Sequence, residues 1–232
     1  MTNTIISAAD QVAAGQLPGG RTPPREPTAI RGLKHDRHGR PIPWFVHVDK
    51  HGKPDFRVIR SRGIQEAVNR GLCWVCGTLR GREAAFVIGP MCTINRISAE
   101  PPSHRECAKY SADACPFLST PSMTRRERGL PEDYADPAGT ACWRNPGVVA
   151  VWFSRRPTVE PAPGGVLFGI GEPSRVLWRC QGREATRAEV LASINSGYPL
   201  LQGECQKDRD PARSLALLDE QRQVAMRYLP AA

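Results

Sequence analysis

The chain has 232 residues, a formal net charge of +9 and a hydrophobic content of 40%. That hydrophobic content is enough for a folded core, so the composition excludes a wholly disordered chain. There is no run of about 20 apolar residues, and the N-terminus lacks the basic leader and apolar stretch of a secretory signal, so we expect a cytoplasmic protein without membrane contact. In a reducing cytoplasm, the eight cysteines indicate metal ligands and buried thiols rather than disulfides.

The first predicted elements are a leader, a hairpin and a short helix. Residues 1–28 are expected to form a disordered leader, because Pro, Gly and Arg cluster at 17–24. Strand-forming residues at 42–48 and 56–59 flank a glycine-containing turn and predict a β-hairpin. A helix is predicted over residues 64–69 and should end at Gly71.

A second hairpin is predicted from residues 84–88 and 91–94, with Gly89 and Pro90 as its turn. Ser103 and Glu106 have the spacing of a capping box, so a helix is expected to begin at Ser103. It should end near Cys115, because Pro116 follows. Together these elements define a predicted zinc-binding domain over residues 29–118.

A linker is predicted over residues 119–146, which are polar and rich in Pro and Gly, and a C-terminal unit over 147–232. Strands are expected at 148–153, 166–168 and 176–178. Thr186 and Glu189 form a capping box for a helix that should end at Gly197, and Asp210 precedes the last helix. The predicted fold is α+β, with an N-terminal β-hairpin and a treble-clef-type zinc domain followed by a small antiparallel sheet-and-helix unit.

Four residues have the spacing of a zinc site. Cys73 and Cys76 are separated by two residues, which lets both thiolates converge on one ion, and Gly77 permits the tight return of the chain. His104 and Cys107 are three positions apart, so their side chains share one face of the predicted helix, whose N-terminus favours a thiolate. Four ligands with no vacant position predict a closed, structural Zn²⁺ site.

Cys92 is an alternative ligand, because it lies in the sequence between the two pairs. Cys115 is excluded as a partner of His104, since eleven residues along a helix span about 16 Å. Apart from that alternative, the cysteines outside the motif are interpreted as small apolar residues of the core: Cys92, Cys115, Cys142, Cys180 and Cys205.

Several strings of the sequence resemble a family of proteins encoded by bacteriophages and mobile elements of bacteria, notably actinobacteria. They are CWVCG at 73–77, IGPMC at 88–92, EPPSHREC at 100–107 and ACPFL at 114–118. WFV at 44–46, PDFR at 54–57 and ATRAEV at 185–190 extend the resemblance over roughly residues 41–200. The resemblance implies a phage-type accessory protein and implies no activity.

Basic charge is concentrated ahead of the zinc motif, where residues 21–70 contain twelve Lys or Arg and five Asp or Glu. Such a patch attracts polyanions by releasing their counterions, so we predict a module that binds nucleic acid or regulates through binding. The candidate contacts are basic and aromatic residues near the zinc elements: Arg57, Arg60, Arg62, Arg80, Arg82, Arg96 and Arg105, with Trp44 and Trp74 for stacking.

The alternative is a protein-interaction module that acts on a host or phage protein. An HNH-type nuclease is disfavoured, because residues 84–96 contain no His or Asp and the helix histidine is a zinc ligand; no catalytic residue is assigned. Four further histidines near the hairpin are interpreted as surface residues, with a second metal site as the other reading: His35, His38, His47 and His51.

Overall fold

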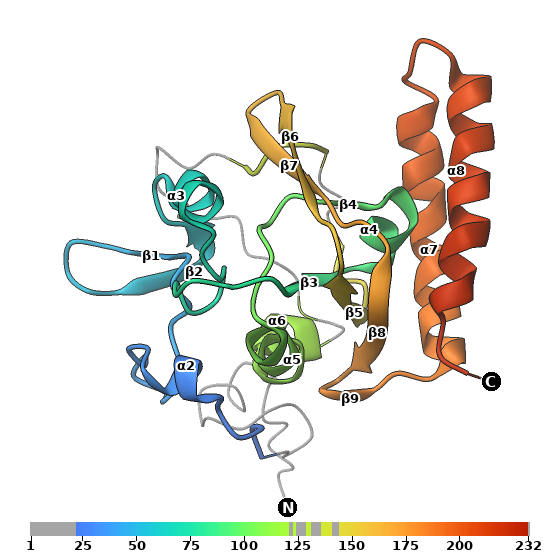
Figure 1. The fold of residues 1–232 in the computed structure, drawn as a ribbon. Helices are drawn as coiled ribbons and strands as arrows, with labels where there is room; N and C mark the ends of the chain where they lie inside the picture. The colour runs from blue at the N-terminus through green and yellow to red at the C-terminus, as the bar shows by residue number, and fades with distance from the viewer. Residues whose placement is uncertain (1–21, 121–122, 124–128, 131–135, 141–143, 232) are drawn as a thin grey trace, which may run out of the picture.

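The structure is a computed structural model that describes residues 22–120, 123, 129–130, 136–140 and 144–231. The predicted leader and the predicted linker lie partly outside these residues. The fold is α+β with antiparallel sheets, as the sequence predicts (Figure 1). No helix of the described residues is long and apolar enough to cross a membrane.

The N-terminal elements match the predicted order. After the single turn α2 (Thr28–Arg31), strands β1 (Val46–Val48) and β2 (Pro54–Ile59) form a hairpin that extends away from the body of the molecule (Figure 1). Helix α3 (Gly63–Arg70) follows and ends at Gly71, whose positive φ of 62° suits a glycine at the end of a helix.

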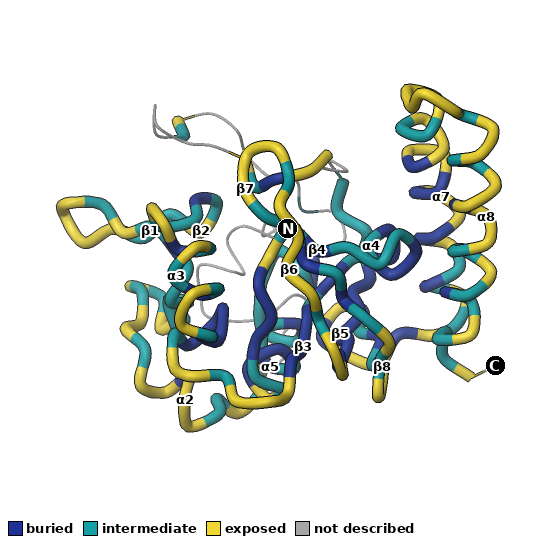
Figure 2. The backbone as a smooth tube through the Cα atoms, turned by 45° about the horizontal axis from the view of Figure 1, so that its top comes forward, coloured by how far each residue is buried: buried dark blue, intermediate teal, exposed yellow. Residues whose placement is uncertain are grey.

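A four-stranded sheet of order β3-β5-β8-β9 forms the centre of the fold. Its strands are β3 (Ala84–Ile88), β5 (Val148–Ser154), β8 (Pro173–Cys180) and β9 (Arg183–Glu184). Every residue of β5 is buried, because this strand has a partner on each side and helices on both faces. Figure 2 shows the buried backbone concentrated here.

The alternation of side chains along β5 divides the core into two layers. On one face, Val149, Val151 and Phe153 pack with Ala108 of α5 (Arg105–Ala114), and α6 (Pro116–Ser119) follows α5 there. On the other face, Trp152 and its neighbours pack against α4 (Pro90–Asn95), α7 (Arg187–Cys205) and α8 (Pro211–Ala225). A 3-10 turn, η1 (Met226–Tyr228), ends this second layer.

The predicted second hairpin is wrong, because residues 90–95 form helix α4 instead of a strand. Pro90 occupies the first helical turn, where its missing N–H costs nothing, and Met91 and Ile94 lie three residues apart with both side chains buried. The strand partner of β3 is β5, with Phe86 opposite Trp152. The central sheet therefore takes strands from both predicted units.

A second, smaller sheet has the order β4-β7-β6, and its Phe168 packs into the core around Trp152. Its strands are β4 (Ile97–Ser98), β7 (Gly165–Gly169) and β6 (Thr158–Ala162), of which β4 and β6 were not expected from the sequence. The predicted strands at 148–153, 166–168 and 176–178 are confirmed.

The two C-terminal helices begin where the sequence predicts. Thr186 and Glu189 form both bonds of the capping box, and the Asp210 side chain accepts from the Arg213 N–H. The predicted end of α7 at Gly197 is wrong, since the helix continues through Pro199 to Cys205. A Cβ at Gly197 would lie 3.0 Å from the Met91 Cε, so this glycine allows close packing of α7 on α4.

Candidate metal centre

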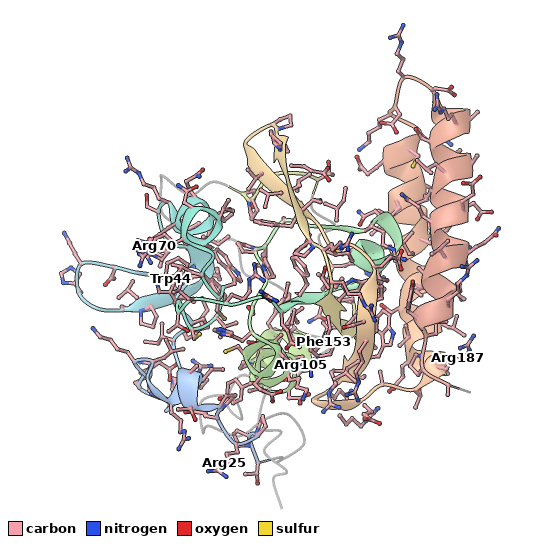
Figure 3. All side chains as sticks on the ribbon, in the orientation of Figure 1. Arg25, Trp44, Arg70, Arg105, Phe153 and Arg187 are labelled. Atoms are coloured by element: carbon pink, nitrogen blue, oxygen red, sulfur yellow. The ribbon has the colours of Figure 1, made fainter. Side chains whose placement is uncertain are left out.

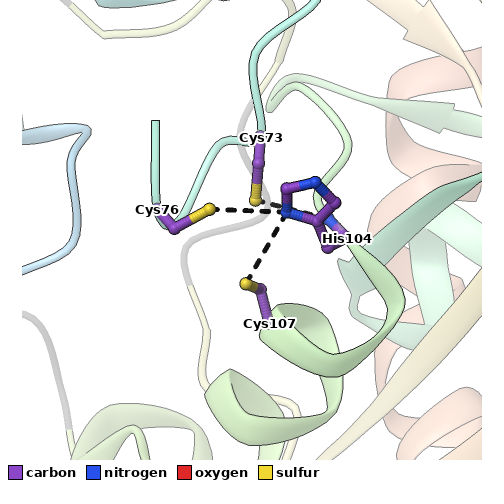
Figure 4. Close-up of side chains that lie close together, drawn as sticks. All are labelled: Cys73, Cys76, His104 and Cys107. Carbon is purple, nitrogen blue, oxygen red and sulfur yellow. Dashed lines mark hydrogen bonds between the residues drawn. The ribbon is translucent and has the colours of Figure 1, made fainter. Parts of the chain in front are cut away.

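Cys73, Cys76, His104 and Cys107 converge on one point, with their ligand atoms all within 4.8 Å of one another. The first two come from the turn between Leu72 and Leu79, and the second two from the start of α5 (Figure 4). This is the set of four residues that the sequence predicts.

A tight turn positions the first pair of cysteines. The Cys73 N–H donates to the Thr78 carbonyl over 2.8 Å, and the Gly77 N–H donates back to the Cys73 carbonyl over 2.9 Å. Gly77 has a φ of +71°, and a Cβ there would lie 2.4 Å from the Trp44 Cδ1. Only glycine meets both requirements, so the turn and the ring of Trp44 fix each other's position.

The second pair is held by a bridge to the central sheet. Ser103 and Ala85 exchange two backbone hydrogen bonds of 2.7 and 2.9 Å. The predicted capping box at Ser103 is therefore wrong: α5 begins at Arg105, His104 is the N-cap residue, and its side chain does not cap the helix. The His104 N–H donates to the Cys73 Sγ over 3.3 Å, which joins the two ligand pairs directly.

The imidazole of His104 is oriented by the turn that carries the cysteines. Its Nε2 lies 2.9 Å from the Leu79 carbonyl oxygen, which can only accept, so Nε2 carries the proton. The lone pair of Nδ1 then faces the sulfur atoms of Cys76, at 3.4 Å, and Cys107, at 3.9 Å. A ligand histidine whose other nitrogen is held by a carbonyl is typical of metal sites.

The three thiols strongly influence each other's protonation. Hydrogen bonds from Cys107 and Cys73 hold the pKa of Cys76 far below its usual range. The same contacts with Cys73 and Cys76 raise the pKa of Cys107, so this thiol keeps its proton beside a thiolate. Three thiolates this close need a positive charge between them, and a divalent cation supplies it.

The geometry fits a tetrahedral metal ion. A zinc ion with Zn–S of about 2.3 Å and Zn–N of about 2.0 Å needs ligand atoms roughly 3.5–3.8 Å apart. The His104 Nδ1 lies 3.4 Å from the Cys76 Sγ and 3.9 Å from the Cys107 Sγ, near that range. Cys73, Cys76 and Cys107 are at most 7% exposed. Four protein ligands, three of them buried, leave no site for substrate or water, so the centre is suited to a structural role.

The other candidate metal ligands lie elsewhere. Cys92 packs against the core on the opposite face of the sheet, which removes it as a ligand. Burial raises the pKa of Cys115 at the end of α5. Cys180 is buried in the core, as the sequence predicts. Cys142 lies outside the described residues. His35 pairs with Glu26 at 3.1 Å, and no second group of ligands occurs in the part of the chain that the structure describes.

Most of the predicted nucleic-acid contacts already have partners within the protein. Arg57 pairs with Asp55 at 2.6 Å, Arg60 with Glu66 at 3.2 Å, and Arg105 with Glu83 at 3.4 Å while it lies over Phe153 (Figure 3). The guanidinium of Arg96 lies over the rings of both Trp152 and Tyr228, where it stabilises the core. Arg80 is half-buried, whereas Arg62 and Arg82 are exposed.

The two tryptophans predicted to stack on bases are covered. Trp74 is 3% exposed and lies parallel to Phe45 at 4.9 Å, so its inclusion as a stacking residue is wrong. The guanidinium of Arg60 covers the ring of Trp44 at 4.4 Å, and Gly77 also lies against that ring. The exposed aromatic ring of the hairpin is that of Phe56, at 43%, which is not among the predicted contacts.

Comparison of the chain with protein-family models, with curated proteins and with solved structures gave no significant match. The resemblance to phage and mobile-element proteins therefore stays a prediction.

Proposed function

We propose that Cys73, Cys76, His104 and Cys107 hold a structural zinc ion, and that the N-terminal unit built around it binds nucleic acid. The convergence of four ligand atoms within 4.8 Å supports the first part. Thiolate and imidazole ligands in a closed tetrahedral arrangement favour zinc over magnesium or calcium, which prefer oxygen. When bound, the ion contributes its binding free energy to the folded state.

The distribution of ion pairs supports the second part of the proposal. The carboxylates of Asp36, Asp55 and Glu66 are paired with arginines close to them in the sequence. The Lys and Arg side chains of this unit that have no carboxylate partner can attract an external polyanion. Within residues 29–118, seven of them are exposed and form no ion pair among the described residues: Arg31, Lys34, Arg37, Lys50, Lys53, Arg62 and Arg82.

Elemental analysis of the purified protein tests the zinc assignment. We expect about one zinc per chain, and we expect Cys107→Ser to lose the metal and to unfold the N-terminal unit. Cys205→Ser is the matched control, since Cys205 lies on α7 away from the cluster. A folded, metal-free Cys107→Ser protein, or wild-type protein without metal, would contradict the assignment.

A salt titration of binding tests the nucleic-acid proposal. Affinity for a DNA or RNA oligonucleotide should fall steeply as the salt concentration rises, because bound phosphates release counterions. Replacing Lys50 and Lys53 together by Gln should lower the slope by about one per lost phosphate contact, whereas the control Lys207→Gln should not. A partner bound independently of salt, with no affinity for oligonucleotides, would instead favour a protein-interaction module.

A further inference from the structure

The β1–β2 hairpin presents an apolar surface where charged residues would be expected on a protruding arm. Phe56 on β2 is 43% exposed and Val48 on β1 is 46% exposed. Nearer the body of the molecule, Val46 and Val58 of the same strands are buried. The apolar side chains thus continue beyond the core along the arm, where no element covers them among the residues described.

The ring of Phe56 is supported from within the protein. The guanidinium of Arg40 lies 5.4 Å from the ring centroid. Arg40 is itself fixed by Asp36, through bonds of 2.8 Å from Nε and 2.6 Å from an Nη, and the Asp36 side chain is only 5% exposed. Burial raises the pKa of Asp36, but hydrogen bonds from Arg40 and the local backbone outweigh this and lower it, so the carboxylate stays charged.

Positive charge flanks this ring on the same arm. Lys50 and Lys53 lie in the turn and are exposed, and Lys53 is three residues from Phe56, about 10 Å along a strand. Asp49, the acidic residue of the turn, accepts hydrogen bonds from the N–H groups of His51 and Lys53. Asp55 is paired with Arg57, and the turn carries two lysines against the single carboxylate of Asp49, so it keeps a net positive charge.

We infer that Lys50, Lys53 and Phe56 form a binding surface for single-stranded nucleic acid, with phosphates on the lysines and a base stacked on the ring. The inference rests on the proposed nucleic-acid-binding function and specifies its ligand. A fixed, exposed ring offers stacking to any unpaired base, whereas the bases of a duplex are already stacked on each other. The lysines alone would attract both forms, so Phe56 is the residue that selects the single strand.

Fluorescence anisotropy with a labelled oligo-dT strand and a duplex of equal length tests this inference on the full chain. Phe56→Ala should weaken binding of the strand by about tenfold, within the range measured for one stacked base, and should leave duplex binding nearly unchanged. Phe56→Trp should restore binding of the strand. Val48→Ala is the matched control, since it removes an equally exposed apolar side chain of the arm without removing a ring, and circular dichroism checks that each variant is folded.

The outcomes separate this inference from the proposal on which it rests. If wild-type protein binds with steep salt dependence but Phe56→Ala binds the strand equally well, the base-stacking surface is wrong and the proposed function stands. If Phe56→Ala weakens strand and duplex equally, Phe56 does not select the single strand. If wild-type protein binds neither form, both ideas fail. A change of oligomeric state in Phe56→Ala without a change in strand affinity would identify the arm as an interface between copies of the chain.

Discussion

Arg80 is half-buried beside the metal centre and has no carboxylate partner in the described part of the chain. The backbone N–H of Arg80 donates to the Gly71 carbonyl, in the same turn in which Cys73 bonds to Thr78. The position of Arg80 is therefore tied to that of Cys73. Burial lowers the pKa of the guanidinium, and the charge of Cys73 opposes that shift. A divalent ion with three thiolates has a net charge of −1, which a buried arginine offsets.

We expect Arg80→Met to weaken metal binding by about 10- to 100-fold, the usual cost of losing a residue that supports the ligands. Arg80→Lys should retain most of the affinity, because it keeps the charge. The exposed neighbour supplies the control Arg82→Met. Competition with a chromophoric chelator measures all four proteins, and equal affinity of Arg80→Met and wild type would mean that Arg80 has no such role.

At the scale of elements, the start of α7 shows how a helix end can respond to pH. A hydrogen bond from Arg183 and then one from the Thr186 N–H lower the pKa of Glu189 from 4.5 to about 2. A carboxyl whose pKa is lowered in the folded state stabilises it above the ordinary pKa, and this stabilisation disappears as the pH falls towards the folded-state value.

We therefore expect Glu189→Gln to lower the free energy of unfolding by about 0.5–1 kcal/mol near neutral pH, the size of a capping interaction. The difference from wild type should shrink between pH 4.5 and about 2, because both side chains are then uncharged. Urea unfolding of both proteins across this pH range measures the difference in the free energy of unfolding. Other groups titrate in both proteins, so their contributions cancel in this difference. A difference independent of pH would contradict the assignment.

Of the two predicted capping boxes, the one at Thr186 forms and the one at Ser103 does not, because the two positions differ in their tertiary contacts. Thr186, at the N-cap, and Glu189, in the first turn, stand at the start of α7, where local signals decide where the helix begins. Ser103 and Glu106 have the same spacing, but the backbone of Ser103 pairs with Ala85 of β3, so the helix begins two residues later. Gly197 failed as a stop signal for a similar reason, since its contact with Met91 of α4 is not visible in the sequence.

Across the whole molecule, the metal centre was predictable because each ligand pair is local. Two residues between Cys73 and Cys76, and two between His104 and Cys107, fix each half of the site within one turn of chain. The pairing of β3 with β5 was not predictable, since about 60 residues separate the strands. The exposure of the aromatic side chains was not predictable from the sequence either, because tertiary packing buries Trp74 and leaves Phe56 in solvent.

The separation of the metal centre from the main core gives a prediction for chelation. Ile30 of α2, Val75 and Tyr110 form a small cluster with the cysteine ligands, whereas the large core between the sheet and α7 contains none of the four. Without the ion, the thiols around this small cluster repel each other when ionised, and the turn that they hold loses its support. The Ser103–Ala85 bridge and the packing of α5 on the other face of β5 link this region to the sheet.

Removal of the metal ion should therefore unfold the region around the cluster before the central sheet. Hydrogen–deuterium exchange with and without a chelator should show rapid exchange of the Cys73 and Gly77 amides, which are bonded within the turn. The amides of β5 and α7 should remain protected. Equal loss of protection throughout the chain would mean that the metal stabilises one cooperative unit, and unchanged protection at Cys73 would mean that the turn does not depend on the ion.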